Sequence, residues 1–231
     1  MDKANDSGLL AKAELFKGID GAAVAEISRM ASHKRASKGE VVFEQGDPAG
    51  ACHVLVEGRV KVTQLTPDGQ QVVIRFIGPG EMFGCIAVFV GGDYPGTATA
   101  VTDSQMLAWD GRKMGMLMER YPGIAVNALA IVGKRLLALQ SRYRELATER
   151  VERRIARAIL RLARQAGKRV EEGVLIDFPL SRQDVAEMTG ATLHTVSRIL
   201  SAWEQQGLIA SGRQRITIRR PHGLVSIAED L

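Results

Sequence analysis

Cysteine is scarce in this chain, and the lack of it excludes several kinds of site. Cys52 and Cys85 are the only cysteines among 231 residues, and no Cys-x-x-Cys spacing occurs. One chain therefore cannot supply the cysteine ligands of a structural zinc site or of an iron–sulfur cluster. A structural disulfide is not expected either, because disulfides are rare in the cytosol.

Long apolar runs are missing as well. No run of about 18 apolar residues predicts a membrane span, and the opening residues MDKANDSGLLAK lack the hydrophobic core of a signal peptide. We therefore expect a cytoplasmic protein with no membrane partner. No nucleophile–base pair, phosphate-binding loop or acid pair appears in a recognisable context, so the sequence does not predict an enzyme.

The charge that is present lies mostly in the C-terminal part. The chain has 31 lysines and arginines against 26 acidic residues, a net charge of +5. Basic residues are dense between positions 142 and 169 and again between 213 and 220. This excess is modest, but its position is compatible with a polyanionic partner.

The first half of the chain predicts a small helical cap followed by a β-domain. Residues 9–35 keep helical spacing of apolar side chains. From Gly39 onward, short apolar runs alternate with turn signals, at residues 41–43, 54–56, 60–62, 72–77, 98–101 and 106–109. Strands at such regular spacing predict a β-sandwich or jelly roll.

A heptad pattern follows at residues 122–148. Apolar residues recur there at alternating spacings of four and three, which is typical of the seam of a two-stranded coiled coil. The predicted dimer interface consists of Leu129, Val132, Leu136, Leu139, Tyr143 and Leu146. The alternative is an amphipathic helix that packs on its own β-domain.

Residues 180–208 predict a helix-turn-helix, with Gly190 at the turn and Ser181 as N-cap of the first helix. In the second helix, Val196, Ile199, Leu200 and Trp203 form one apolar stripe that should face the core. His194, Ser197, Arg198 and Ser201 lie on the opposite face, where they could donate to base edges and phosphates. The alternative is a helical corner with a merely solvated polar face.

The residues after Gly207 predict a β-hairpin with a Ser-Gly turn, similar to the wing of a winged helix. Arg213, Arg215, Arg219 and Arg220 would lie beside the phosphate backbone of DNA. The hydroxyls of Ser181, Thr192 and Thr195 are further candidates for backbone contacts. A helix at 151–167, a strand at 174–178 and a short C-terminal helix at 223–229 complete this region.

The whole chain resembles the CRP/FNR family of bacterial transcription regulators. FEQGDPAGACHVLVEGRVKV is similar to the first glycine-rich hairpin block of that family, FIGPGEMFG to the strand before its ligand cassette, and LSRQDVAEMTGATLHTVSRIL to its DNA-binding helices. The resemblance implies an α+β fold: a jelly roll of the cyclic-nucleotide-binding type at 1–121, a dimerisation helix at 122–148 and a winged helix-turn-helix at 149–231.

Within the family, the signature His194-x-x-Ser197-Arg198 is most similar to the nitrogen-oxide-responsive NnrR-like branch. The resemblance implies a homodimeric regulator, and an activator, that binds a TTG/CAA-type inverted repeat in double-stranded DNA. It also implies RNA polymerase as a partner and genes of nitrogen-oxide or denitrification metabolism as targets. Arg198 would contact guanine in each half-site, while Ser197 and His194 would tune the flanking bases.

The sensor remains open from sequence. The places that bind ribose and phosphate in cAMP-binding relatives hold Cys85 and Gly96-Thr97 here, which argues against cAMP. Iron or haem held by Cys52, His53 and Cys85 is one alternative, and buried side chains without a ligand are the other. A competing function for the whole chain is a small-molecule-binding module that regulates a protein partner, and a lectin-like enzyme is a third.

Overall fold

The computed structural model describes the backbone of residues 3–230 and the side chains of residues 7–230. The chain divides into two compact units, of which unit 1 comprises Met1–Leu65 and Arg75–Ala138, and unit 2 comprises Thr66–Ile74 and Leu139–Leu231. The division falls within a long helix. Each unit is described by itself.

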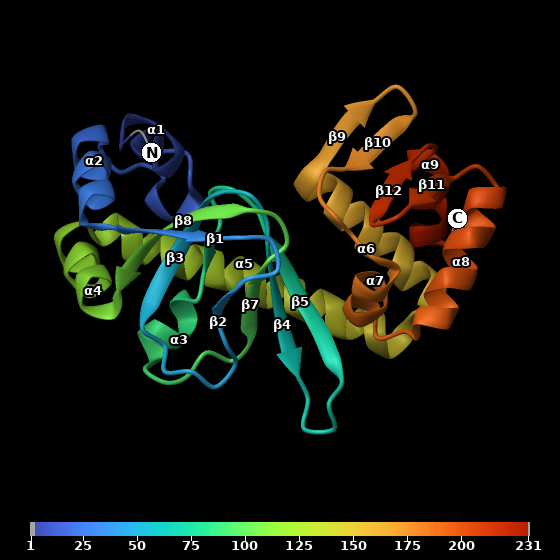
Figure 1. Ribbon diagram of the computed structural model, residues 1–231, viewed down its shortest axis with the longest axis horizontal. Helices are drawn as coiled ribbons and strands as arrows, with labels where there is room; N and C mark the ends of the chain where they lie inside the picture. Colours follow the sequence, from blue (N-terminus) through green and yellow to red (C-terminus); the bar gives the residue numbers. More distant parts are fainter. Residues whose placement is uncertain (1–2, 231) are drawn as a thin grey trace. The chain divides into compact units, whose positions relative to one another are not determined.

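Unit 1 contains two four-stranded sheets, with strand orders β1-β8-β3-β6 and β2-β7-β4-β5 (Figure 1). All six predicted strands are present, most of them extended by one or more residues. The strands are β1 (Ser32–Ala36), β2 (Val41–Phe43), β3 (Ala51–Glu57), β4 (Val60–Leu65), β5 (Gln71–Ile77, whose first four residues belong to unit 2), β6 (Met82–Phe83), β7 (Thr97–Ala100) and β8 (Ser104–Asp110). The sequence did not predict β1, because its residues SHKRA are mostly exposed, or β6, which has only two residues.

Helices cover one end of the β-domain. They are α1 (Lys3–Leu10), the 3-10 turn η1 (Glu14–Phe16), α2 (Gly21–Met30), α3 (Cys85–Val90) and α4 (Gly111–Arg120). Figure 1 shows α1, α2 and α4 gathered at that end of the sheets. Trp109 of β8 is fully buried beneath them, and its indole Nε1 donates to the carbonyl of Ile27 at 3.0 Å. The predicted helical cap is therefore confirmed as two helices and a turn that share one core with the sheet. Its predicted end at residue 35 is wrong, because α2 ends at Met30 and residues 32–35 belong to β1.

The helix α5 (Pro122–Thr148) has two apolar faces with different surroundings. Ile124, Ala128 and Ile131 are buried in the core of unit 1. On another face, Leu129, Leu136, Leu139, Tyr143 and Leu146 are more than half exposed, and Val126 and Leu137 extend this exposed band beyond the predicted seam. Val132 is only partly exposed. Packing on the helix's own β-domain therefore occurs, but it leaves a second apolar face uncovered.

By length and composition α5 is also apolar enough to cross a membrane. The prediction that no stretch of the chain has this character is wrong on that point, because Lys134 and Arg135 interrupt the run without making it polar overall. The buried contacts of Ile124, Ala128 and Ile131 account for one apolar face of the helix without a membrane.

After the last part of α5, unit 2 contains α6 (Val151–Ala166), β9 (Gly167–Val170), β10 (Gly173–Ile176) and α7 (Arg182–Thr189). It continues with α8 (Leu193–Gln205), β11 (Ile209–Gly212), β12 (Arg215–Ile218) and α9 (Pro221–Glu229). The strands form one sheet in the order β11-β12-β10-β9. This confirms the predicted winged-helix order of elements and adds β9, which begins at Gly167, a residue whose position predicts only the end of a helix.

Candidate nucleic-acid interface

The first helix of the motif, α7, is fixed at both ends by its sequence. Ser181 Oγ accepts a hydrogen bond from the Asp184 amide at 3.0 Å, and the Asp184 carboxylate accepts one from the Ser181 amide at 2.9 Å. This reciprocal capping box satisfies two amides that a helix start leaves unpaired. At the other end Gly190 adopts φ 61° and ψ 38°, a left-handed conformation that favours glycine. Both predicted roles are confirmed.

The second helix, α8, is anchored through its predicted apolar stripe. Val196, Ile199, Leu200 and Trp203 are all buried. The indole Nε1 of Trp203 donates to the carboxylate of Glu152 on α6 at 2.9 Å. Because these side chains take up one face of α8, the opposite face is left to the surface.

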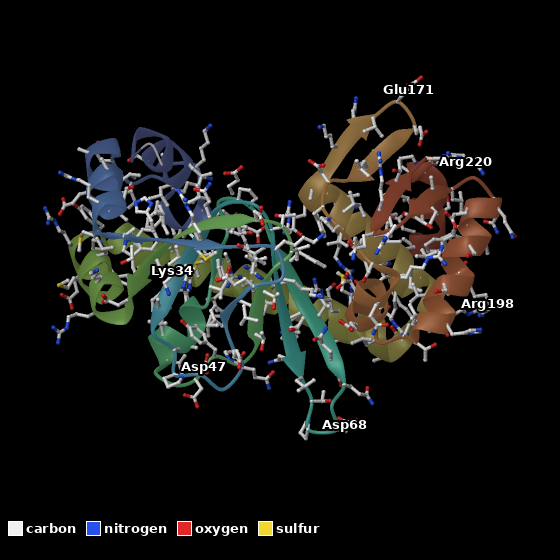
Figure 2. All side chains as sticks on the ribbon, viewed as in Figure 1. Lys34, Asp47, Asp68, Glu171, Arg198 and Arg220 are labelled. Atoms are coloured by element: carbon white, nitrogen blue, oxygen red, sulfur yellow. The ribbon has the colours of Figure 1, made fainter. Side chains whose placement is uncertain are left out.

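On that surface face, His194 and Arg198 are exposed and Ser197 is half-buried. We call these three residues the recognition face. Within the described part of the chain, the side chains of His194 and Arg198 have no hydrogen-bond or ion-pair partner. Figure 2 shows Arg198 on the outer side of α8, pointing away from the rest of unit 2. A guanidinium held on a rigid helix with all its donors free is suited to bidentate binding of a guanine edge.

Thr192 and Thr195, predicted as contacts to the DNA backbone, bind each other. Thr192 is the N-cap of α8, and its Oγ1 accepts from the Thr195 amide at 3.1 Å. The two hydroxyls are 2.9 Å apart. Each hydroxyl keeps hydrogen-bonding capacity for a phosphate, so the cap and a backbone contact are compatible.

Arg182 is a residue that the sequence analysis missed. Its guanidinium donates to the Ser197 carbonyl and the Ser201 hydroxyl, both at 3.4 Å, and to the Ser211 hydroxyl at 3.0 Å. It also pairs with Glu204 at 3.3 Å. These bonds connect α7 to α8 and to β11. Ser201, predicted to lie on the free polar face, is therefore already bound within the protein.

Bonds of this kind span 15 to 29 positions along the chain, which local sequence patterns do not reveal. One feature of the sequence could have indicated a structural role for Arg182, its place at the first position of a helix. A positive charge is unfavourable there because of the helix dipole, so an arginine at that place suggests a partner elsewhere in the fold.

The wing is the hairpin of β11 and β12, in which Ser211 pairs with Ile216 and Gly212 with Arg215. The tight turn consists of Arg213 and Gln214, the latter at φ 58°, so the predicted Ser-Gly turn is wrong by two residues. Arg213 and Arg215 are exposed and have no ion-pair partner among the described residues. By contrast, Arg219 lies 3.9 Å from the carboxylate of Glu172, and Arg220 donates to the Gly207 carbonyl.

The candidate sensor residues lie in unit 1, and of the three only the two cysteines contact each other. Cys52 and Cys85 are both buried in the core beneath the helices, where their thiols contact each other. His53, the next residue on β3, points to the other side of the strand and stacks on Phe83, with ring centroids 5.0 Å apart. No group of three histidine, cysteine or acidic side chains among residues 7–230 could hold a metal ion.

Burial also sets the ionisation of these groups. Desolvation lowers the pKa of His53 to about 4, with a further contribution from the positive charge of Lys34. A hydrogen bond with the Cys85 thiol and burial raise the pKa of Cys52 well above its ordinary value. The two imidazole nitrogens of His53 have no hydrogen-bond partner, yet the ring is packed between aromatic side chains and only 2% exposed. These residues therefore do not fit haem or iron, which needs converging ligands and space.

The comparisons with known proteins match the two parts of the chain to two different kinds of domain. Residues 33–121 match the sequence model of the cyclic nucleotide-binding domain, and residues 153–227 match that of the Crp-like helix-turn-helix domain. The nitrogen fixation regulation protein FixK of Rhizobium meliloti is 31% identical over 190 residues, which is 82% of this chain and 83% of that protein. This chain belongs to the CRP/FNR family of transcription regulators.

Two further similarities support the assignment. A CRP-like cAMP-activated global transcriptional regulator of Mycobacterium tuberculosis is 25% identical over 87% of this chain and 90% of its own length. The solved structure of FixK2 from Bradyrhizobium japonicum superposes with a TM-score of 0.75 at 25% identity, covering 85% of this chain and 96% of that one. This CRP/FNR regulator is therefore a DNA-binding protein and not an enzyme, and its α+β fold is the one predicted from sequence.

Proposed function

We propose that this CRP/FNR regulator is a homodimeric activator that binds a TTG/CAA-type inverted repeat through the recognition face of α8. The observation that carries the proposal is the free Arg198 guanidinium beside the free His194 imidazole, on a helix whose other face is buried. The unpaired Arg213 and Arg215 of the wing supply positive charge for the phosphate backbone. In this proposal Ser181, Thr192, Thr195 and Ser197 add polar contacts around the base-reading arginine.

A titration of the full-length protein with two labelled duplexes tests this function. One duplex carries TTG and CAA half-sites whose centres are about one helical turn apart, and the other has the same composition in scrambled order. We expect tighter binding to the first duplex, with an affinity that falls steeply as salt rises. Equal binding to both duplexes would contradict sequence-specific recognition. Absence of any salt-dependent binding would favour the competing function, a module that regulates a protein partner.

Dimerisation through the exposed face of α5 is the second part of the proposal. Leu129 and Tyr143 are each 74% exposed, a large cost for apolar side chains unless a second copy covers them. Leu136, Leu139, Leu146 and the half-covered Val132 continue this face. Sedimentation should show a dimer for the wild type and a monomer for Leu136→Glu. Val90→Glu is the matched control, because Val90 is exposed but lies on α3; dissociation of both variants alike would contradict the assigned interface.

The biological setting in the proposal is the control of nitrogen-oxide or denitrification genes in the cytoplasm, together with RNA polymerase. Its support is the His-x-x-Ser-Arg signature of α8 and the relative that is named for regulation of nitrogen fixation. Transcription in vitro from a promoter with this repeat and purified RNA polymerase tests activation directly. A fall in transcript on adding the protein would make it a repressor instead.

Control by cAMP is not part of the proposal, although one family model and several relatives are named for cyclic nucleotides. Cys85 is 1% exposed, and the Tyr94 ring stacks on Phe43 at 3.8 Å while its hydroxyl donates to the Ala51 carbonyl. An added Cβ at Gly96 would lie 2.6 Å from the Thr63 carbonyl, so the backbone there is already closely packed. DNA affinity should therefore be the same with and without cAMP.

A further inference from the structure

The wing and α8 are joined by a network of polar side chains that the proposed contacts to DNA do not use. The carboxylate of Glu204, in the last turn of α8, accepts from the amide and from the hydroxyl of Ser211 on β11, each at 2.7 Å. Arg182, the first residue of α7, donates to the same hydroxyl at 3.0 Å and pairs with the Glu204 carboxylate at 3.3 Å. Three elements of unit 2 therefore meet at these three side chains, which we call the brace.

Arg182 lies along a stripe of α8 that is next to the recognition face. Ser197, Ser201 and Glu204 follow one another at i, i+4 and i+7, so they lie on one side of the helix. The Arg182 guanidinium also donates to the Ser197 carbonyl and the Ser201 hydroxyl. Its two terminal nitrogens thus make two bonds each, which matches the N–H groups that they carry. Unlike those of Arg198, these donors are occupied within the protein, so Arg182 is suited to holding elements together.

Ser211 places the brace close to the turn of the wing. The base of the hairpin is fixed by backbone hydrogen bonds at Leu208. Ser211 lies further along β11, beside the turn that carries Arg213 and Arg215. Because β11 is the edge strand of its sheet, the outward amide of Ser211 is available to bond to Glu204. The brace therefore holds the part of the wing that bears its two exposed arginines.

We infer that Arg182 and Glu204 are positioning residues for DNA binding: through Ser211 they hold the wing in the place, relative to α8, at which both elements contact one duplex. In that arrangement the wing arginines meet phosphates while Arg198 meets a base edge. A wing that is fixed before binding avoids the loss of conformational entropy that ordering it on the DNA would cost. This inference rests on the proposed function of α8 and the wing.

The wing is also held from its other side, which limits what loss of the brace should do. The amide of Leu180 donates to the carbonyl of Gln214 in the turn at 3.0 Å. This bond joins backbone groups, so no side-chain substitution in the brace removes it. The side chains of Arg182 and Glu204 are 35% and 30% exposed, and ion pairs of this kind add little to stability. Substitutions in the brace should therefore loosen the wing without unfolding unit 2.

Titration of the operator duplex and the scrambled duplex over a range of salt concentrations tests this role. Arg182→Gln and Glu204→Ala should each bind both duplexes about three- to tenfold more weakly than the wild type, because the wing must then be ordered on binding. The slope of log affinity against log salt should stay unchanged, since the wing keeps its arginines. Glu171→Ala is the matched control for a lost negative charge and should bind as the wild type does. Figure 2 shows Glu171 at the tip of the hairpin of β9 and β10, where it is exposed.

Two results of these titrations would overturn the inference. Wild-type affinity in both Arg182→Gln and Glu204→Ala would mean that the brace does not position the wing for binding. A salt slope that falls by about one in Arg182→Gln would make Arg182 a phosphate contact itself.

A combination of substitutions separates a positioning role from a merely structural one. In a protein that already carries Arg213→Ala and Arg215→Ala, Glu204→Ala should cause no further loss of affinity, because the wing then has no arginine to position. The same loss as in the wild-type background would overturn the inference. Ser211→Ala, which removes one hydroxyl and no charge, provides the same test if Glu204→Ala fails to fold. Equal binding of the wild type to both duplexes would contradict sequence-specific recognition, yet it would leave this comparison valid, because the comparison is made on each duplex separately.

Discussion

The polar side chains of α8 and those of β3 have opposite surroundings, although both stretches carried candidate functional residues. On α8 and the adjoining wing, His194, Arg198 and Arg213 are exposed and unpaired in the described structure. On β3, Cys52 and His53 are at most 2% exposed and packed among apolar or aromatic neighbours. The first set is free to bind a partner, whereas the second set is already part of the core.

This contrast separates two effects that substitutions should have. A change on the recognition face should alter DNA binding and leave the fold intact, because the side chain makes no contact within the protein. A change in the core should alter stability, since buried groups lose packing or solvation. Pairs of substitutions within one element test this separation most clearly.

The largest expected effect comes from truncating Trp203, on the buried face of α8. Trp203→Ala removes a fully buried indole and leaves Glu152 without its hydrogen-bond donor. We expect a loss of about 3–5 kcal/mol in the free energy of unfolding, measured by urea denaturation. His194→Ala on the same helix should change that free energy by less than about 0.5 kcal/mol. Similar losses in the two variants would mean that the faces of α8 are wrongly assigned.

The next effect is a pH dependence that originates at His53. Its pKa is about 4 in the folded protein and about 6.5 when unfolded, so the unfolded chain binds the proton more readily. Above pH 6.5 the ring is neutral in both states and the free energy of unfolding is at its full value. As pH falls from 6.5 toward 4, the unfolded chain takes up the proton first, and the free energy of unfolding falls by about 3 kcal/mol at most. Denaturation at a series of pH values checks it.

His53→Phe provides the comparison, because it keeps the ring stack on Phe83 and cannot be protonated. The variant should show a shallower loss of stability between pH 6.5 and 4 than the wild type. Identical pH profiles would show that His53 is not the buried neutral group described here.

A smaller effect is expected at the cap of α7. Ser181→Ala removes the hydroxyl that accepts from the Asp184 amide and should cost about 1 kcal/mol. Ser181→Asn should retain most of the stability, since asparagine caps as well as serine. If Ser181 also contacts phosphate, Ser181→Ala should bind DNA more weakly even under conditions in which the variant is fully folded. A Ser181→Ala variant as stable as the wild type would argue against the capping box.

The smallest effects are expected in the wing. Arg213→Ala and Arg215→Ala should each weaken binding to all DNA sequences alike and reduce the slope of log affinity against log salt by about one. Arg219→Ala should change the slope less, because Arg219 lies beside Glu172. A wing substitution that alters the preferred sequence would contradict a purely backbone role.

The sequence predicted the elements with strong periodicity well, because each pattern has one structural solution. The stripe of Val196, Ile199, Leu200 and Trp203 predicted the buried face of α8, and Gly190 predicted the left-handed turn. The two-residue error at the wing turn has a physical reason: Gln214 adopts a positive φ that a local pattern assigns to glycine.

Contacts between distant residues could not be predicted in the same way. Arg182 connects α7, α8 and β11, and the pair of Arg75 and Arg135 at Met82 joins β5, β6 and α5. Neither depends on spacing along the chain. Adjacency in the sequence is also a poor guide to a shared site. Cys52 and His53 resemble a pair of metal ligands, but successive residues of a strand point to opposite sides of the sheet.

The specificity of Arg198 tests the account most directly. The measurement is the affinity of wild type and Arg198→Ala for the operator and for duplexes with single base-pair changes in each half-site, with Arg112→Ala as a control for lost charge. We predict that Arg198→Ala folds normally but loses discrimination at one base pair per half-site, worth about 1–3 kcal/mol. An Arg198→Ala protein with the sequence preference of the wild type would contradict recognition of DNA by the exposed face of α8.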